Sequence, residues 1–278
     1  MKNFLIVIGS TILLFGILVS ISAYLGRDLI VSLQNQVTKS NEANGSKLIS
    51  RFALVSDTHS DTDSTNRAVR QIKNLGLDYV VHTGDWTNLG TRDELLVQKK
   101  IFDSLALPYW GVMGDRERWQ SGEKNFESVF GKRYDLFEKN GIVHILIDSS
   151  DIYNGLGEEQ LDWLERELVK NQGKKKLIFM QLPPYHPSSN RTISSKAGFD
   201  QKREDDTARF LRLIDDQNVL GIFSGDHHLS ASYTEPKTSV RIIISGAVTS
   251  ERNLQSSRWS LVEVYDNGFI NVSDQVIN

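Results

Sequence analysis

The sequence predicts an α/β domain built around a largely parallel β-sheet. Short apolar runs, each long enough for one buried strand, alternate with segments of helical periodicity between residues 52 and 113. This alternation is typical of βαβ units joined by right-handed crossovers. Period-two runs occupy the C-terminal third of the chain and predict a second, mostly antiparallel sheet packed on the first.

The first half of the domain follows the alternation closely. The segments expected as strands are residues 52–55, 79–81 and 109–113, and those expected as helices are residues 64–75 and 91–105. The second helix opens with Thr91-Arg92-Asp93-Glu94, a capping box in which the threonine and glutamate side chains satisfy free backbone N–H groups. These three strands are therefore expected to form the parallel part of the sheet.

The second half combines a hairpin, a strong helix and several short strands. Residues 133–138 and 142–147 are expected to pair across Lys139-Asn140-Gly141, and a helix follows at residues 158–170. A polar insert at residues 188–205 is long for a compact domain, and loops of that length are usually functional or mobile. The other segments are a helix near residues 207–216 and strands at residues 177–180, 219–223, 231–233, 240–244, 260–264 and 269–272.

The N-terminus predicts a membrane segment. Residues 4–25 are apolar apart from small residues and hydroxyls, which matches the roughly 20 residues that span a bilayer as a helix. Residues 1–26 are thus expected to be a transmembrane anchor or a signal segment, and residues 27–48 a polar juxtamembrane linker. The domain at residues 49–278 would lie on the extracytoplasmic side, anchored, or secreted if the segment is cleaved.

Composition narrows the classes of function. The net charge of -3 predicts no surface for nucleic acid or another polyanion. The chain has no cysteine, which excludes disulfides, thiolate zinc sites and cysteine nucleophiles.

Four polar stretches follow apolar runs that read as buried strands. They are Asp57-Thr58-His59, Gly84-Asp85, Gly114-Asp115-Arg116-Glu117 and Gly225-Asp226-His227-His228. Because the carboxyl ends of neighbouring parallel strands meet at one crevice, these stretches are expected to converge there. Carboxylates and imidazoles are ligands of divalent metals. A carboxylate at Asp85 could bridge two ions, as in the two-metal clamps of phosphoryl chemistry.

From about residue 51 to the C-terminus these stretches, together with Val81-His82-Thr83-Gly84-Asp85, resemble the calcineurin-like metallophosphoesterases. The resemblance implies a four-layer αββα sandwich of two mixed β-sheets flanked by helices. It also implies a phosphomonoesterase or phosphodiesterase that uses a metal-activated water. The substrate would be a small-molecule or lipid-linked phosphoester.

Carried over to this chain, the family pattern divides into two parts. The ligands that the family uses for its first metal are all present, as Asp57, His59, Asp85 and His228. The ligands private to the second metal are changed, and these positions hold Asp115, Gln181 and Asp226. The family's catalytic histidine corresponds to Arg116.

Two hypotheses explain the changed positions. The oxygen ligands suit a hard second ion, so the cofactor would be one or two divalent cations, Mn, Mg, Zn or Fe. Alternatively the site binds one metal, and Arg116 pairs with Asp115 or Asp226 in place of the second ion.

The loss of a general acid leaves two classes of function open. Arg116 can bind phosphate but cannot give up a proton, so His186 is a candidate replacement acid and Arg191 a candidate substrate contact. His82 and His144 lie in strands and are expected to be core residues. The rival to a hydrolase is a catalytically inactive descendant that binds one metal or a phosphorylated ligand.

Overall fold

The computed structural model describes residues 45–119, 123–194 and 200–278. Leu48–Asn278 form one compact unit. The predicted membrane segment at residues 1–26 lies outside the described residues. Among the helices that are described, none has the length and apolar character needed to cross a membrane.

The first sheet has five strands in the order β11-β10-β1-β2-β3. β1, β2 and β3 run parallel, whereas β10 is antiparallel to β1 and β11 is antiparallel to β10. Its strands are β1 (Leu48–Val55), β2 (Tyr79–His82), β3 (Tyr109–Gly111), β10 (Arg258–Tyr265) and β11 (Ile270–Val276). The helices of its outer layer are α2 (Thr62–Lys73), α3 (Arg92–Asp103) and α4 (Glu123–Phe130), and a 3₁₀ turn η1 (Arg116–Arg118) precedes α4.

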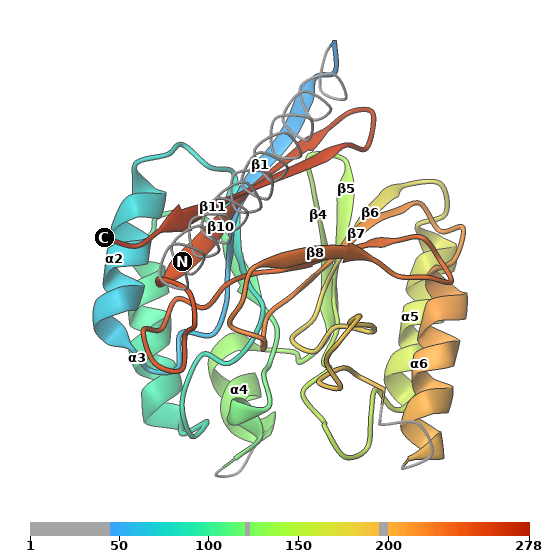
Figure 1. Cartoon of the computed structure of the whole chain (residues 1–278), viewed down its shortest axis with the longest axis horizontal. Helices are drawn as coiled ribbons and strands as arrows, with labels where there is room; N and C mark the ends of the chain where they lie inside the picture. The colour runs from blue at the N-terminus through green and yellow to red at the C-terminus, as the bar shows by residue number, and fades with distance from the viewer. Residues whose placement is uncertain (1–44, 120–122, 195–199) are drawn as a thin grey trace, which may run out of the picture. The chain divides into compact units, whose positions relative to one another are not determined.

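The second sheet has six strands in the order β4-β5-β6-β7-β9-β8. β5, β6, β7 and β9 are parallel, and β4 and β8 pair antiparallel at the two edges. Its strands are β4 (Asp135–Lys139), β5 (Ile142–Leu146), β6 (Lys175–Phe179), β7 (Val219–Ser224), β8 (Ala231–Thr234) and β9 (Arg241–Ile244). Helices α5 (Glu158–Lys170) and α6 (Gln201–Ile214) cover its outer face (Figure 1).

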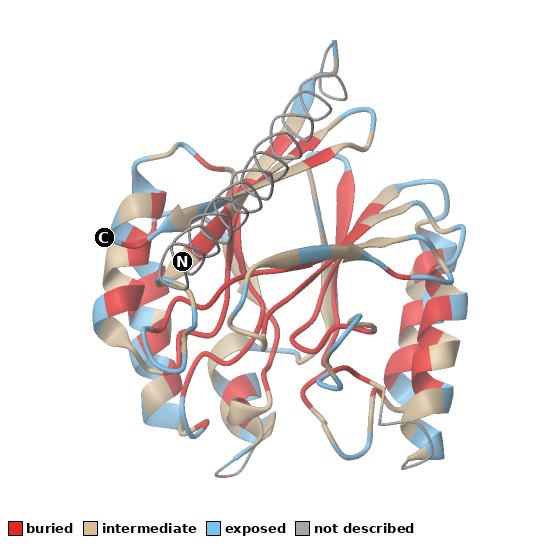
Figure 2. Ribbon diagram, in the orientation of Figure 1, coloured by how far each residue is buried: buried red, intermediate tan, exposed pale blue. Residues whose placement is uncertain are grey.

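Three apolar clusters hold the layers together. One joins the first sheet to α2, α3 and α4, one joins the second sheet to α5 and α6, and the third lies between the sheets. The middle cluster contains Phe52, Tyr79, Phe179 and Phe223, all with no exposed surface. Figure 2 shows the central strands mostly buried, whereas the edge strands β4, β8 and β11 are largely half-buried or exposed. The four-layer αββα sandwich of two mixed sheets is confirmed.

The C-terminal strands correct one prediction. We expected them to form a second sheet of their own, but β8 and β9 join the second sheet while β10 and β11 join the first. Each pair extends a sheet that the parallel strands already form. Period-two patterning shows that a strand has one buried face but does not show which sheet it joins.

Two helices differ from prediction. The helix α4 was not predicted, because it has only eight residues, although Phe126, Val129 and Phe130 follow helical spacing and pack in one cluster. The helix α6 begins at Gln201, inside the segment predicted as an insert. Asp200 caps it by accepting a hydrogen bond from the backbone N–H of Arg203 at 3.2 Å. The run of charged residues in its first turns resembles a polar loop in sequence.

Candidate metal centre

Tight turns at the ends of β1, β2 and β7 carry the polar residues to one place. Asp57, Asp85 and Asp226 follow these strands and have positive φ angles of 52°, 55° and 66°. A non-glycine residue in this left-handed region costs of the order of 1 kcal/mol or more, and such residues cluster at functional sites. These unfavourable turn conformations direct the three carboxylates toward the same site.

Two glycines let the turns approach one another. A Cβ on Gly114 would lie 2.2 Å from the backbone nitrogen of Asp85, and a Cβ on Gly225 would lie 1.9 Å from Oγ of Ser56. Neither approach is sterically possible, so these positions require a residue without a side chain. Gly114, before Asp115, lets the loop after β3 meet the loop after β2, and Gly225, before Asp226, lets the loop after β7 meet the end of β1.

What we call the retained site is defined as Asp57, His59, Asp85 and His228. Ligand atoms of Asp57, His59 and His228 lie within 4.8 Å of one another, and Asp85 adjoins this group through His59. The Nε2 atoms of His59 and His228 lie 3.0 Å apart. Nε2 of His59 lies 3.6 Å from Oδ2 of Asp85, and Nε2 of His228 lies 3.5 Å from Oδ1 of Asp57. Ligands that bind one ion at about 2.0–2.2 Å lie roughly 3–4.4 Å from each other, so this donor set fits a divalent cation.

The electrostatics of the retained site also fit a cation. Burial alone would raise the pKa of Asp57, but hydrogen bonding and charge attraction from His228, with contributions from His59 and Ser56, lower it. Burial lowers the pKa of His59 to about 4, which keeps the imidazole neutral and able to bind metal. Burial and the surrounding carboxylates raise the pKa of Asp85 well above its usual value. A nearby cation would relieve that repulsion.

The remaining predicted ligands gather at what we call the altered site, defined as Asp85, Asp115, Gln181 and Asp226. Carboxylate oxygens of its three aspartates lie within 4.8 Å of one another. The amide of Gln181 donates to Oδ1 of Asp85 at 2.8 Å and to Oδ1 of Asp115 at 2.7 Å. The side chain predicted as an oxygen ligand thus presents its nitrogen to the carboxylates.

Arg191, predicted as a substrate contact, binds the altered site. Its Nε donates to Oδ2 of Asp226 at 2.7 Å, and its Nη2 forms a short contact with Oδ1 of the same carboxylate. Nη2 also lies 3.7 Å from Oδ1 of Asp115. The hydrogen bonds to Asp226 raise the pKa of Arg191, which stays charged.

Arg116 does not contact the carboxylates that the one-metal hypothesis assigned to it. Its Nε is 4.0 Å from Oδ2 of Asp85, and its guanidinium lies over the ring of Trp119 at 5.4 Å from the centroid. Within the described residues its ion pair is with Asp85, whereas Asp115 and Asp226 pair with Arg191. The prediction that Arg116 pairs with Asp115 or Asp226 was therefore wrong, because the insert brings a different arginine to them.

The two sites open into one cavity of about 200 Å³. It is lined by His59, Asp85, Arg116, Arg191, Asp226, His227, His228 and Arg252. Arg252 was missed by sequence reasoning, because it lies in a loop before β10 with no motif around it. Because Arg191 is bound to Asp226, the lining arginines suited to an anionic ligand are Arg116 and Arg252.

His186 is not among the residues that line this cavity. Its Nδ1 accepts hydrogen bonds from the backbone N–H groups of Ser188 and Ser189, and its ring packs on His227 and Tyr233 with centroids 4.5 and 5.0 Å away. These contacts fix the start of the insert. The structure therefore gives His186 a structural position rather than the one expected of a replacement acid.

Glu117, like Arg252, is a residue whose role the sequence did not predict. It is fully buried and accepts hydrogen bonds from the backbone N–H groups of Thr87 and Gly114, at 2.9 and 2.8 Å. Burial raises its pKa to about 7. Glu117 ties the loop after β2 to the loop after β3, which places Asp85 next to Asp115.

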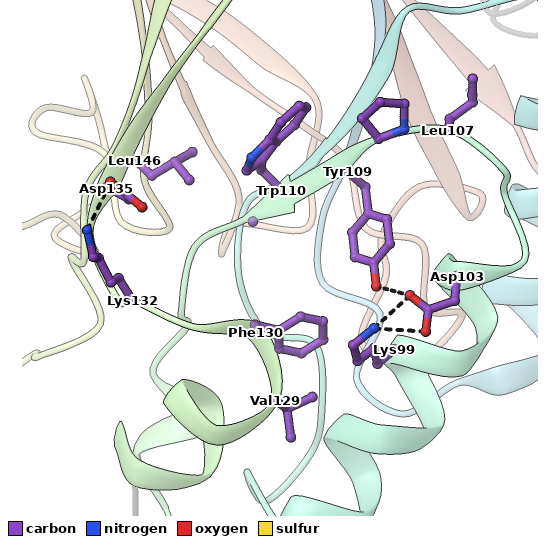
Figure 3. A pocket seen from close by; sticks show the side chains of 12 residues that line it. Lys99, Asp103, Leu107, Tyr109, Trp110, Val129, Phe130, Lys132, Asp135 and Leu146 are labelled. Atoms are coloured by element: carbon purple, nitrogen blue, oxygen red, sulfur yellow. Dashed lines mark hydrogen bonds and ion pairs between the residues drawn. The ribbon is translucent and has the colours of Figure 1, made fainter.

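A larger cavity of about 390 Å³ lies away from the metal ligands, beside β3 and the ends of α3 and α4 (Figure 3). Its lysines are paired with acids that also line it, Lys99 with Asp103 at 2.8 Å and Lys132 with Asp135 at 3.7 Å. Its charges are therefore compensated locally, and it lacks the ligand set of the metal centre.

Comparison with solved structures identifies proteins that share this fold. A dimetal phosphatase from Danio rerio superposes with a TM-score of 0.63 at 15% identity, covering 84% of this chain and all of that one. Purple acid phosphatase PPD1 from yellow lupin superposes at 0.59 with 10% identity, over 82% of this chain and 51% of that one. GAP50, the anchor in the inner membrane complex of Plasmodium, superposes at 0.55 with 15% identity, over 84% and 90%. The same fold thus occurs in phosphatases and in an anchor protein.

Comparison with curated proteins gives nearer relatives. A probable glycerophosphodiester phosphodiesterase GpdQ of Arcobacter nitrofigilis is 32% identical over 120 residues, which are 38% of this chain and 42% of the relative. A probable cyclic nucleotide phosphodiesterase of Rhodococcus erythropolis is 26% identical over 211 residues, 68% of this chain and 67% of the relative. The chain thus matches less than half of the length of the Arcobacter protein.

The family model of calcineurin-like phosphoesterases matches residues 50–230, which is more than half of the chain. The matched region contains every strand-end turn of the metal centre. This chain belongs to the calcineurin-like phosphoesterase family.

Proposed function

We propose that this protein hydrolyses phosphoric esters at a metal centre held by the retained site. The observation that carries the proposal is the convergence of ligand atoms from Asp57, His59 and His228, with the two Nε2 atoms 3.0 Å apart and Asp85 beside His59 at 3.6 Å. Burial keeps His59 neutral, and Nε2 of His228 faces the carboxylate of Asp57 at 3.5 Å. Such an arrangement is expected of metal ligands.

A divalent cation bound there supplies a water molecule of lowered pKa and polarises the phosphoryl group. Arg116 and Arg252 line the same cavity and would bind the non-bridging oxygens of the ester. The Nε of Arg116 is buried and has no hydrogen-bond partner among the described residues. A phosphoryl oxygen would satisfy this donor, which supports a role for Arg116 in holding the substrate.

The cavity favours substrates with good leaving groups. Arg116 cannot donate a proton to the leaving oxygen, since a guanidinium does not deprotonate in proteins. Nε2 of His227, another residue of the cavity lining, lies 2.8 Å from the carbonyl oxygen of Arg191 and donates its proton there. Departure of the leaving group would therefore depend on its own acidity or on water.

The relatives favour a phosphodiester over a phosphomonoester. The two curated relatives with named activities are a probable glycerophosphodiester phosphodiesterase and a probable cyclic nucleotide phosphodiesterase. We propose a phosphodiester substrate on this basis, with an organic group on each side of the phosphate.

The experiment compares bis(p-nitrophenyl) phosphate with p-nitrophenyl phosphate in Mn²⁺, Mg²⁺ and Zn²⁺. We expect turnover of the diester that is lost in Asp57→Asn, and retained in the exposed control Asp63→Asn on α2. If metal binds but neither ester is cleaved with any of the three ions, the protein is instead a metal- or phosphate-binding member of the family. The glutamine amide that faces the carboxylates of the altered site is the observation that favours this second candidate.

For the location of the domain, the apolar residues 4–25 support our proposal that it lies outside the cytoplasmic membrane. Fractionation of cells that express the full chain, followed by protease treatment of intact spheroplasts, would test it. An anchored domain is cleaved from the membrane fraction, and a secreted one appears in the medium. Protection from the protease would contradict both.

A further inference from the structure

We propose that Arg191 replaces the second metal ion, so that the centre binds one divalent cation at the retained site and a guanidinium at the altered site. The inference rests on the proposed function, since it concerns the same centre. It differs from an arginine that binds substrate, because here the guanidinium is bound to the protein's own carboxylates.

The first argument is the geometry of Arg191. Its Nε lies 2.7 Å from Oδ2 of Asp226, its Nη2 contacts Oδ1, and the same Nη2 lies 3.7 Å from Oδ1 of Asp115. Both oxygens of Asp226 are thus bound in the two-pronged manner that guanidinium and carboxylate favour. The Asp226 side chain is 1% exposed, so this carboxylate needs a cation close by.

The second argument is the orientation of Gln181. Its Oε1 accepts a hydrogen bond from the backbone N–H of Asp115 at 2.9 Å. Its Nε2 then donates to Asp115 and to Asp85. A flipped amide would place N–H against N–H and oxygen against carboxylate, so the chain itself fixes the direction. The amide supplies donors where a metal ion would need an acceptor.

The third argument is competition for the same oxygens. A divalent cation would bind the carboxylates of the altered site at about 2.0–2.6 Å. Oδ1 of Asp115 and Oδ1 of Asp85 already accept from Gln181, and both oxygens of Asp226 accept from Arg191. The guanidinium and the amide together occupy the positions from which these oxygens would bind a second ion.

Charge balance agrees with one ion. The aspartates of the two sites are Asp57, Asp85, Asp115 and Asp226. One divalent cation with the guanidinium groups of Arg116 and Arg191 neutralises all four carboxylates. A second divalent cation beside Arg191 would add charge repulsion at a distance of a few ångströms. The nearby carboxylate of Glu117 already accepts hydrogen bonds from the backbone N–H groups of Thr87 and Gly114.

The test counts metal ions and does not depend on turnover. Full-length protein is equilibrated with Mn²⁺ by dialysis, the bound metal is measured by mass spectrometry, and electron paramagnetic resonance reports coupling between neighbouring ions. We expect about one Mn²⁺ for each wild-type chain and about two, with a coupled signal, for Arg191→Met. Gln181→His, which offers an imidazole where the amide donates, should also gain affinity for a second ion.

Arg252→Met is the matched control, because Arg252 lines the same cavity but has no ion pair to the carboxylates in the described part of the chain. It should keep one ion. Two coupled ions in the wild type would overturn this inference and leave the proposed function intact. A count of one in both Arg191→Met and Gln181→His would also overturn it. Absence of metal from the wild type would instead contradict the retained site itself.

Discussion

The hydroxyl of Tyr79 on β2 donates a hydrogen bond to Nε2 of His144 on β5 at 2.5 Å, across the interface between the two sheets. Nδ1 of His144 lies 3.0 Å from the carbonyl oxygen of Ile142 and must be the protonated nitrogen, so Nε2 is the acceptor. The prediction that His144 is a core residue is confirmed by its burial. The middle of the sandwich thus contains a neutral imidazole with both nitrogens satisfied.

Because the imidazole of His144 is buried and neutral, we expect the stability of the protein to depend on pH. Burial lowers the pKa of His144 to about 4, whereas the unfolded chain should titrate near 6.5. The unfolded state then binds the extra proton between these values, so the free energy of unfolding falls as the pH decreases from about 6.5 to 4. We expect about 2 kcal/mol of this loss between pH 7 and pH 5 to come from His144.

Urea unfolding at pH 7 and pH 5 would measure this loss. His144→Gln, which can still accept from Tyr79, should show a smaller difference between the two pH values even though its stability at pH 7 is lower. Equal differences in the two proteins would refute the assignment.

Metal binding at the retained site should stabilise the fold. An ion that binds the native state at 100 times its Kd adds about 2.7 kcal/mol, which corresponds to a rise in Tm of roughly 5–10 °C for a domain of this size. Thermal melts with and without Mn²⁺ should show this rise in the wild type and not in His228→Ala. Asp63→Asn, exposed on α2, should behave as the wild type.

The contact between Gly114 and Asp85 makes a third prediction. Alanine at position 114 would place a methyl group 2.2 Å from the backbone nitrogen of Asp85 and 2.1 Å from its Oδ1. We expect Gly114→Ala to lose about 1–3 kcal/mol of stability and to bind metal more weakly, because Asp85 must move.

Gly221→Ala is the comparison for this glycine. A Cβ there would approach the flexible end of Ile270 at 3.2 Å, within β7 and away from the ligands. It should keep metal affinity, as measured by calorimetric titration with Mn²⁺. Equal loss of affinity in both variants would show that the effect is general destabilisation.

A fourth prediction concerns Arg116, at the position where the family resemblance implies a catalytic histidine. Arg116→His would supply a group able to protonate the leaving oxygen, and general acid catalysis is typically worth 10²–10⁴-fold. The rate for alkyl diesters should rise relative to that for p-nitrophenyl diesters, by about tenfold or more. A plot of log kcat against leaving-group pKa would be shallower in the variant. An unchanged slope would show that the histidine at position 116 does not act as a general acid.

The residues of the retained site could be predicted because each sits at a fixed offset from a strand end. Asp57, His59 and Asp85 follow the ends of β1 and β2 by two to four residues, so the parallel pairing of those strands brings them together. For these residues, the distance along the chain from the strand end already determines the place in the fold. The four-layer architecture followed from the same positions through the family resemblance.

The altered site could not be predicted to the same depth. Gln181 was identified as a site residue, but whether its oxygen or nitrogen faces the carboxylates depends on the backbone N–H of Asp115. Arg191 lies in the loop after β6, and its path is set by contacts such as the hydrogen bond from Arg203 to the carbonyl oxygen of Thr192 at 2.9 Å. No periodicity in the sequence carries that information.

The link between Arg191 and Asp226 also bears on how the protein responds to metal supply. An ion is exchanged with its surroundings and is lost to a chelator or to scarcity, whereas a guanidinium on the chain stays at a fixed local concentration. A centre in which Arg191 supplies one of the two positive groups exchanges one metal ion with the medium. A centre with two metal ions exchanges two. The occupancy of the one-ion centre would then vary with the first power of the free metal concentration, so that activity would decline gradually as the metal becomes scarce.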